Sequence, residues 1–157
     1  MVGVTPVRRI VADFGADGLS RVVLDESVPL EGEPERIRLT NLWLAPMARG
    51  PNDTPFDGGF VPFSMAQTQA DAYAMTLVEY APGFGRDDPG MHSTETIDHF
   101  YVVEGEIVMV LDVGEALFRV GDTGIIRGVR HGWRNDATGV AKLLFFVLPV
   151  TARGRES

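Results

Sequence analysis

Residues 92–112 read HSTETIDHFYVVEGEIVMVLD, and residues 121–135 read GDTGIIRGVRHGWRN. The first stretch has runs of β-favouring residues on either side of Glu104-Gly105-Glu106, which predicts a hairpin. The second has a Gly-Asp turn, a short apolar run that ends at Arg127, and a further turn at Gly128. Together they predict short antiparallel strands joined by tight turns.

The strand pattern continues on both sides of these stretches. Short runs rich in β-branched and aromatic residues predict further strands at residues 8–13, 21–25, 37–45, 74–80, 116–120 and 141–150. The last run, AKLLFFVLPV, is apolar on both faces, so we expect a covered central strand. Eight or more short strands, without a convincing helix, predict one all-β domain built as a sandwich or barrel.

Residues 46–73 interrupt the pattern. The segment MARGPNDTPFDGGFVPF contains three prolines and three glycines, which exclude a regular helix or a central strand. A connection of this length is a mobile surface loop, a lid over a ligand mouth, or an arm exchanged between copies. We expect the strands of residues 1–45 and this segment to belong to the same domain as a barrel core at residues 74–150.

Composition limits the classes of function. The formal net charge of -8 argues against nucleic-acid and anionic-membrane partners, because clustered Lys and Arg bind both. The chain has no cysteine, which excludes disulfides, thiolate catalysis and zinc–thiolate sites. Its first residues lack an apolar run of signal-peptide length, and no stretch approaches the ~20 apolar residues of a membrane helix. We therefore expect a cytoplasmic protein.

Two groups of polar residues carry a recognisable spacing. The first reads His92-x-Thr94, three residues, Asp98, six residues, Gly105; the second reads Gly121-Asp122, Ile126-x-Gly128, two residues, His131, three residues, Asn135. This order resembles the two motifs of the cupin superfamily, whose members are jelly-roll barrels, and it covers roughly residues 75–150. A subset of one-domain cupins carries the same single histidine, threonine and aspartate in the first motif. Its members are often labelled cupin-domain oxidoreductases of polyketide or aromatic pathways.

The resemblance implies that His92, Asp98 and His131 meet inside the barrel as catalytic and metal-binding residues. Two imidazoles and one carboxylate suit one divalent metal, namely Fe, Mn or Zn. Two departures put the metal in doubt: Thr94 stands where the family has a second histidine, and Asp98 is one methylene shorter than the usual glutamate. The alternative is a metal-free pocket in which the histidines act as acid and base near neutral pH. Purely structural histidines are a third reading.

Four residues are candidate substrate contacts: Thr94, Tyr101, Arg127 and Trp133. Arg127 is expected to bind a carboxylate or phenolate through paired hydrogen bonds. Tyr101 and Trp133 either form flat apolar walls for an aromatic ligand or pack in the core. His99 differs in strand parity from Asp98, so we expect it to face away from the site.

These features predict a small-molecule enzyme that acts inside the barrel on an aromatic or polyketide-like carbonyl compound. Its chemistry is either metal-assisted oxidation or acid–base decarboxylation, cyclisation or isomerisation. A non-catalytic metabolite-binding cupin is the alternative, and a structural barrel with a vestigial pocket is a third hypothesis. By analogy with the family, we expect a homodimer.

Overall fold

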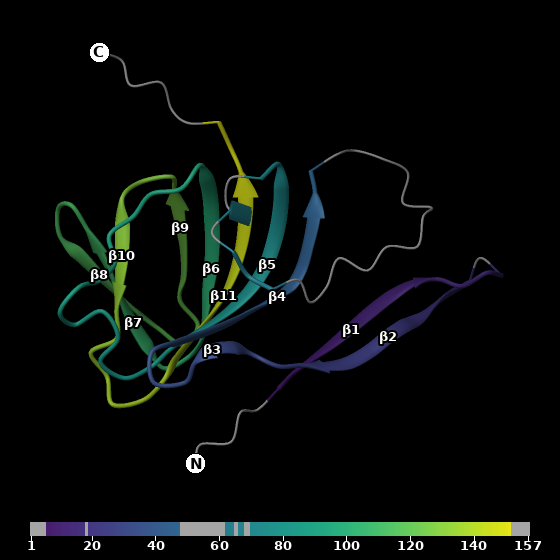
Figure 1. Ribbon diagram of the computed structural model, residues 1–157, viewed down its shortest axis with the longest axis horizontal. Coiled ribbons are helices and arrows are strands. Elements are labelled where there is room, and N and C mark those ends of the chain that lie inside the picture. Colours follow the sequence, from purple (N-terminus) through teal and green to yellow (C-terminus); the bar gives the residue numbers. More distant parts are fainter. Residues whose placement is uncertain (1–5, 18, 48–61, 65, 68–69, 152–157) are drawn as a thin grey trace.

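The computed structural model describes residues 6–17, 19–47, 62–64, 66–67 and 70–151. Most of the predicted lid, arm or loop at residues 46–73 lies outside these ranges. The described part is built from strands and turns (Figure 1), which confirms the all-β prediction. Within the described residues, no helix has the length and apolar character needed to cross a membrane.

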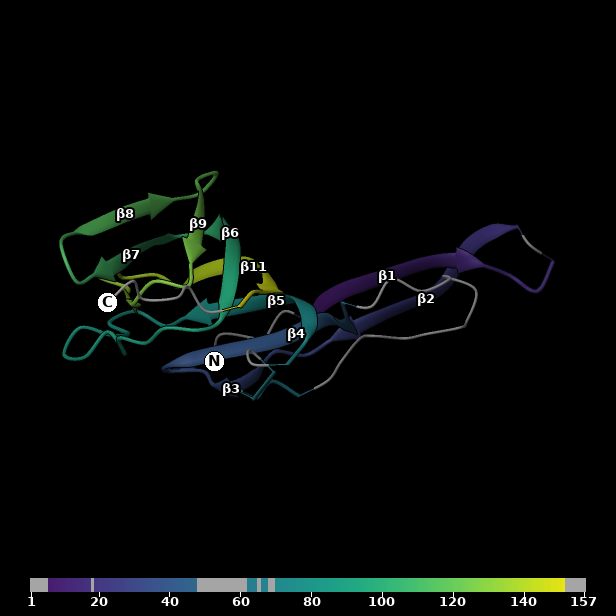
Figure 2. The ribbon, with the colours of Figure 1, turned by 90° about the horizontal axis from the view of Figure 1, so that it is seen from above.

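The strands form two sheets and a separate hairpin. Their bounds are β1 (Val7–Phe14), β2 (Ser20–Val28), β3 (Glu31–Glu33), β4 (Ile37–Pro46), β5 (Ala72–Tyr80), β6 (Thr96–Glu104), β7 (Glu106–Leu111), β8 (Glu115–Arg119), β9 (Thr123–Arg127), β10 (His131–Arg134) and β11 (Ala141–Pro149). One sheet has the order β3-β4-β5-β11-β6-β9, and the other has the order β10-β7-β8. Figure 2 shows β7 and β8 lying across from β5 and β11, so the two sheets enclose a core.

The structure contains two strands that the sequence patterns miss. β3 has three exposed residues, and β10 has four residues that include Gly132. Neither has a run of β-favouring residues, so propensity gives no signal. β10 forms because its backbone pairs with β7, where His131 lies opposite Leu111 and Trp133 lies opposite Met109. Tertiary pairing rather than local preference creates the strand that carries one predicted site residue.

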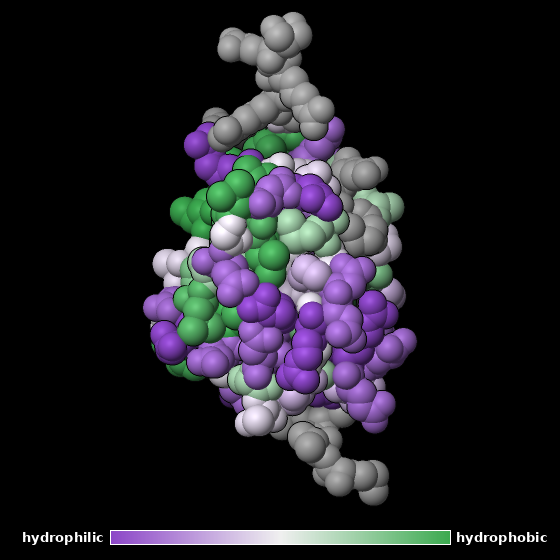
Figure 3. All heavy atoms as spheres, turned by 90° about the vertical axis from the view of Figure 1, so that its left-hand side faces the viewer, coloured by the Kyte–Doolittle hydropathy of each residue, from purple (hydrophilic) through white to green (hydrophobic). Residues whose placement is uncertain are grey.

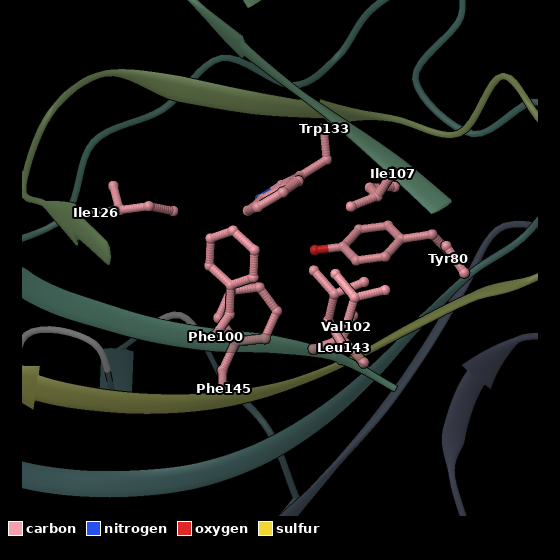
Figure 4. Packing of buried hydrophobic residues seen from close by; sticks show 10 residues of the cluster. Tyr80, Phe100, Val102, Ile107, Ile126, Trp133, Leu143 and Phe145 are labelled. Atoms are coloured by element: carbon pink, nitrogen blue, oxygen red, sulfur yellow. The ribbon is translucent and has the colours of Figure 1, made fainter. Parts of the chain in front are cut away.

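The core lies between the two sheets. β11 pairs with both β5 and β6, as expected for a covered central strand, and its residues Leu143 and Phe145 are buried. They pack against Phe100 from β6 and Trp133 from β10, so both sheets contribute to one cluster (Figure 4). Burying one such side chain stabilises the fold by about 1.5–3 kcal/mol.

The β1–β2 hairpin, which we call the arm, extends away from the barrel (Figures 1 and 2). Its two strands pair only with each other. Its base contacts the outer face of the six-stranded sheet, where Val7 and the buried Leu30 pack with Leu42 and Leu77. The Arg9 guanidinium, also buried, donates a hydrogen bond to the backbone oxygen of Leu42 at 3.3 Å. The arm is therefore anchored at its base and projects beyond it.

The side of the barrel that carries β8 and β10 faces the viewer in Figure 3. Hydrophilic side chains cover most of this side, with apolar ones between them. The strand and turn residues of the β7–β8–β9 region include the exposed Val113, Leu117 and Val120. In Figure 3 the apolar side chains gather mainly toward the upper left of this side, and hydrophilic ones cover its middle and lower right.

Candidate functional site

The structure brings His92 and His131 side by side. His131 begins β10, and His92 forms an isolated antiparallel bridge with it. The two backbones exchange hydrogen bonds, His92 N to His131 O at 2.8 Å and His131 N to His92 O at 2.9 Å. The ring centroids are 4.5 Å apart with an angle of 51° between the planes. The two motif histidines therefore form a contacting pair, with His131 buried and His92 exposed.

A backbone carbonyl fixes the proton position on each imidazole. His92 Nδ1 lies 2.8 Å from the oxygen of Gly90, and His131 Nδ1 lies 3.0 Å from the oxygen of Val129. Because a carbonyl oxygen only accepts hydrogen bonds, Nδ1 carries the proton in both rings. In the neutral imidazoles, Nε2 then holds a lone pair. Both rings thus present a proton-accepting or ligand nitrogen on the side away from the main chain.

Asp98 lies on the inward face of β6, at the same end of the barrel. Strand alternation buries Thr96, Asp98 and Phe100 together. The Thr96 hydroxyl donates a hydrogen bond to Asp98 Oδ1 at 2.6 Å, and the Thr94 and Thr96 hydroxyl oxygens lie 2.6 Å apart. Thr94, one of the predicted substrate contacts, is therefore the half-buried outer member of a chain of hydrogen bonds that leads to Asp98.

Burial moves the pKa values of Asp98 and His131 in opposite directions. Desolvation raises the pKa of Asp98, against the hydrogen bond from Thr96 and the charges of the nearby histidines. Desolvation lowers the pKa of His131, against the bond to the Val129 carbonyl and the charge of Asp98. The site therefore holds a carboxyl group that keeps its proton more readily than usual beside an imidazole that loses its proton more readily than usual. Such a pair is suited to acid–base chemistry.

The donor set does not fit a metal ion as it stands. Among the described residues, no group of three His, Asp or Glu side chains is arranged to hold one. The short Asp98 side chain has one oxygen bonded to Thr96, and the Thr94 hydroxyl is bonded to the same threonine. The predicted ligands His92, Asp98 and His131 thus share one end of the barrel without forming a coordination group.

Comparisons with known proteins bear on this barrel. Residues 76–147 match the family described as the cupin domain. The barrel has the cupin fold. The jelly-roll fold expected from the motifs is confirmed, since the cupin domain of Schizosaccharomyces pombe Cnp3 superposes with a TM-score of 0.55 over 90% of this chain and 87% of that one. At 13% identity this likeness concerns the fold alone.

The curated relatives of this cupin include proteins of fungal biosynthesis clusters. The oryzines biosynthesis cluster protein J of Aspergillus oryzae is 38% identical over 84 residues, which are 50% of this chain and 45% of that protein. The cupin-domain-containing oxidoreductase srdD of Neurospora crassa is 26% identical over 144 residues, which are 80% of this chain and 72% of that protein. The present chain spans less than half of the length of the first relative.

Two predicted substrate contacts lie outside the cupin barrel. Tyr101 follows the buried Phe100 on β6 and is 48% exposed on the outer face. Arg127 follows the buried Ile126 on β9, pairs with Ile97, and is exposed. Strand alternation explains both corrections, because each residue is one position away from an inward-facing neighbour. Both side chains therefore lie on the outer face of the six-stranded sheet, away from the barrel interior.

Trp133 lies inside, where it was predicted. It is 5% exposed, and its ring centroid is 5.9 Å from that of His131 and 5.2 Å from that of Phe100. The indole therefore links the histidine pair to the aromatic core. This position fits both predictions for Trp133, core packing and contact with a ligand, because one face of a ring can pack while its edge meets a ligand.

Tyr80 is a site residue that the sequence reasoning missed. It ends β5, is 4% exposed, and its hydroxyl points toward the interior near Trp133 and Phe100 (Figure 4). Burial and the charge of Asp98 raise its pKa, so it stays protonated at neutral pH. The alternation of residues 74–80 could have predicted this position, because it places Tyr80 on the same face of the strand as Val78.

Asn135, the last residue of the second motif, has a structural role. It is fully buried, and its Nδ2 donates to the backbone oxygens of Tyr80 at 3.0 Å and Gly139 at 2.9 Å. Its Oδ1 accepts from the backbone N–H of Ala137 at 3.0 Å. This amide fastens the turn after β10 to the end of β5, and so holds the strands of His131 and Tyr80 in register.

Proposed function

We propose that this cupin is an acid–base enzyme acting on a small aromatic or polyketide-like carbonyl compound. One observation carries the proposal: two contacting imidazoles each have Nδ1 bound to a main-chain carbonyl, next to a buried carboxyl group. The reaction class is proton transfer at a carbon beside a carbonyl, as in isomerisation, cyclisation or decarboxylation. The names of relatives, which include biosynthesis cluster proteins, support a substrate from secondary metabolism.

His131 is the base in this proposal. Its Nε2 lone pair takes a proton from the carbon next to the carbonyl, and the C–H electron pair forms the enolate double bond while the carbonyl π electrons move to oxygen. Burial keeps the imidazole neutral, and thus able to accept a proton, at lower pH than a solvated histidine. The same ring is oriented by the Val129 carbonyl, which receives Nδ1–H.

Asp98 is the acid. Burial raises its pKa, so it keeps its proton to higher pH than an ordinary aspartate, and the Thr96 hydroxyl donates a hydrogen bond to one of its carboxyl oxygens. Returning a proton to a different carbon of the enolate completes an isomerisation without any oxidant or reductant. His92, exposed at the mouth, exchanges protons between the site and water.

A metal-assisted oxidation is the second candidate, and the names of several relatives as oxidoreductases favour it. Elemental analysis of protein purified without chelators separates the two proposals. Stoichiometric Fe, Mn or Zn that disappears in His131→Ala would contradict the metal-free acid–base proposal. We expect no stoichiometric metal.

Hydrogen exchange tests the acid–base proposal without knowledge of the natural substrate. Bicyclic aromatic ketones such as α-tetralone are incubated with the protein in D₂O, and loss of the α-proton signal is followed by NMR. We expect wild type to accelerate exchange, and His131→Gln and Asp98→Asn to lose about 100-fold or more of the acceleration. Binding of these ketones without accelerated exchange would favour a metabolite-binding cupin. Accelerated exchange that survives in His131→Gln would show that His131 is not the base.

A further inference from the structure

Four buried residues of the barrel each keep one polar atom without a hydrogen-bond partner among the described residues. The atoms are Tyr80 Oη, Asp98 Oδ2, His131 Nε2 and Trp133 Nε1. The residues are between 2% and 9% exposed. Leaving a buried polar group unpaired costs about 1–3 kcal/mol, so four such groups in one barrel call for a partner.

These atoms are not sealed inside the protein. Among the described side chains, Thr40 Oγ1 is the atom that is both enclosed and without a partner. The free atoms of the four residues therefore keep some accessible surface and border space of at least water size. Buried polar side chains around reachable space are the usual lining of a ligand site.

The four residues are neighbours. The ring centroid of Trp133 is 6.0 Å from that of Tyr80 and 5.9 Å from that of His131. The charge of Asp98 acts on both Tyr80 and His131. Two of the free atoms, the phenol O–H and the indole N–H, are hydrogen-bond donors, whereas His131 Nε2 is an acceptor. The two donors and the base together match an oxygen and an acidic C–H of one ligand.

We propose that the Tyr80 hydroxyl, assisted by the Trp133 N–H, binds the carbonyl oxygen of the substrate and stabilises the enolate that forms when His131 removes the adjacent proton. The inference rests on the proposed function and adds an oxyanion site to it. The ligand class is a planar carbonyl compound with an enolisable C–H beside an aromatic ring. Tyr80 remains a hydrogen-bond donor throughout, and the proton removed by His131 is the only one transferred in this step.

Binding of a stable oxyanion tests Tyr80 directly. The 4-nitrophenolate anion resembles the enolate in being planar and aromatic, and its visible absorbance reports binding. We expect Tyr80→Phe to weaken its binding by about 10- to 100-fold, the usual loss for a hydrogen bond to a charged group. Tyr101→Phe, on the outer face, is the matched control and should bind as wild type does. Binding of 4-nitroanisole, which has no oxyanion, should be the same in wild type and Tyr80→Phe.

Each outcome separates this inference from the acid–base proposal. Equal phenolate affinity in wild type and Tyr80→Phe, or no binding to wild type, overturns the oxyanion site. An equal loss for 4-nitroanisole also overturns it, because Tyr80 would then act only through packing. In the α-tetralone assay, Tyr80→Phe should lose about 100-fold of the acceleration. Exchange by wild type that Tyr80→Phe retains would sink the oxyanion site alone and leave His131 as the base.

Discussion

The barrel and the arm are both antiparallel β-structure, but they are stabilised in different ways. In the barrel, β11 lies between two strands and its inward residues meet a second sheet. In the arm, β1 and β2 pair only with each other, and exposed ion pairs such as Arg8 with Asp25 link them. Exposed ion pairs contribute little because water screens them. The barrel is therefore stabilised by its own core, whereas the arm depends on the contacts that its base makes with the six-stranded sheet.

Truncating one leucine in each region should give the largest contrast in stability. Leu143 is fully buried in the barrel, so Leu143→Ala should lower the free energy of unfolding by about 2–5 kcal/mol. Leu19, in the arm, is 63% exposed, and Leu19→Ala should cost less than about 0.5 kcal/mol. Urea denaturation of the two variants and of wild type measures both losses. Similar losses for the two variants would show that the arm shares the core of the barrel.

The same contrast explains what could be read from the sequence. Runs of β-favouring residues at 99–112 and 141–150 predicted the barrel strands, because strands that pack in a core are rich in apolar and β-branched side chains. The spacing of the motifs correctly placed His92 and His131 together, since that pairing depends on backbone register. The strand β10 was missed because pairing with β7, rather than composition, creates it.

Side-chain direction was harder to predict than position along the chain. Tyr101 and Arg127 lie in the expected strands but on the outer face, and counting from Phe100 and Ile126 would have shown this. The ligand set depended on side-chain reach and hydrogen bonding at Asp98, which spacing does not encode. The direction of the arm depends on contacts at Leu30 and Leu42, and neither residue belongs to a sequence motif.

Replacing a turn glycine with alanine should give a smaller difference in stability loss between the barrel and the arm. Gly105, between β6 and β7, has a φ of 72°, and a Cβ there would lie 2.3 Å from the backbone oxygen of Val140. Gly105→Ala should cost more than the about 1–2 kcal/mol of the left-handed backbone alone. In the arm, a Cβ on Gly15 would meet only the flexible end of Arg21, so Gly15→Ala should change stability little.

Gly114→Ala controls for the backbone conformation in that experiment. Gly114 has a φ of 81°, but nothing lies within 4 Å of its added Cβ. The loss of stability of Gly114→Ala, measured by thermal denaturation, should therefore report backbone strain without a steric clash. If Gly105→Ala and Gly114→Ala lose the same stability, the closed packing against β11 does not constrain the β6–β7 turn.

The smallest expected effects concern carboxylates, and they should have opposite signs in the two regions. Burial raises the pKa of Asp98, so the stability from holding its proton is complete below about pH 3.9 and is lost as pH rises through the folded-state pKa. Asp98→Asn keeps an acceptor for Thr96 and has no proton to lose. Its melting temperature should exceed that of wild type near pH 7, and the gap should close toward about pH 3.

Asp25 in the arm should behave in the reverse way. The hydrogen bond from Arg8 lowers the pKa of Asp25, so its contribution is present above about pH 3.9 and is lost as pH falls through the folded-state pKa. Asp25→Asn should thus melt slightly below wild type near pH 7 and match it in acid. Melting temperatures of both variants across this pH range check the signs. A gap for Asp98→Asn that does not change with pH would mean that its carboxyl is hydrated, and would remove the acid from the proposed site, because burial is what raises the pKa of Asp98.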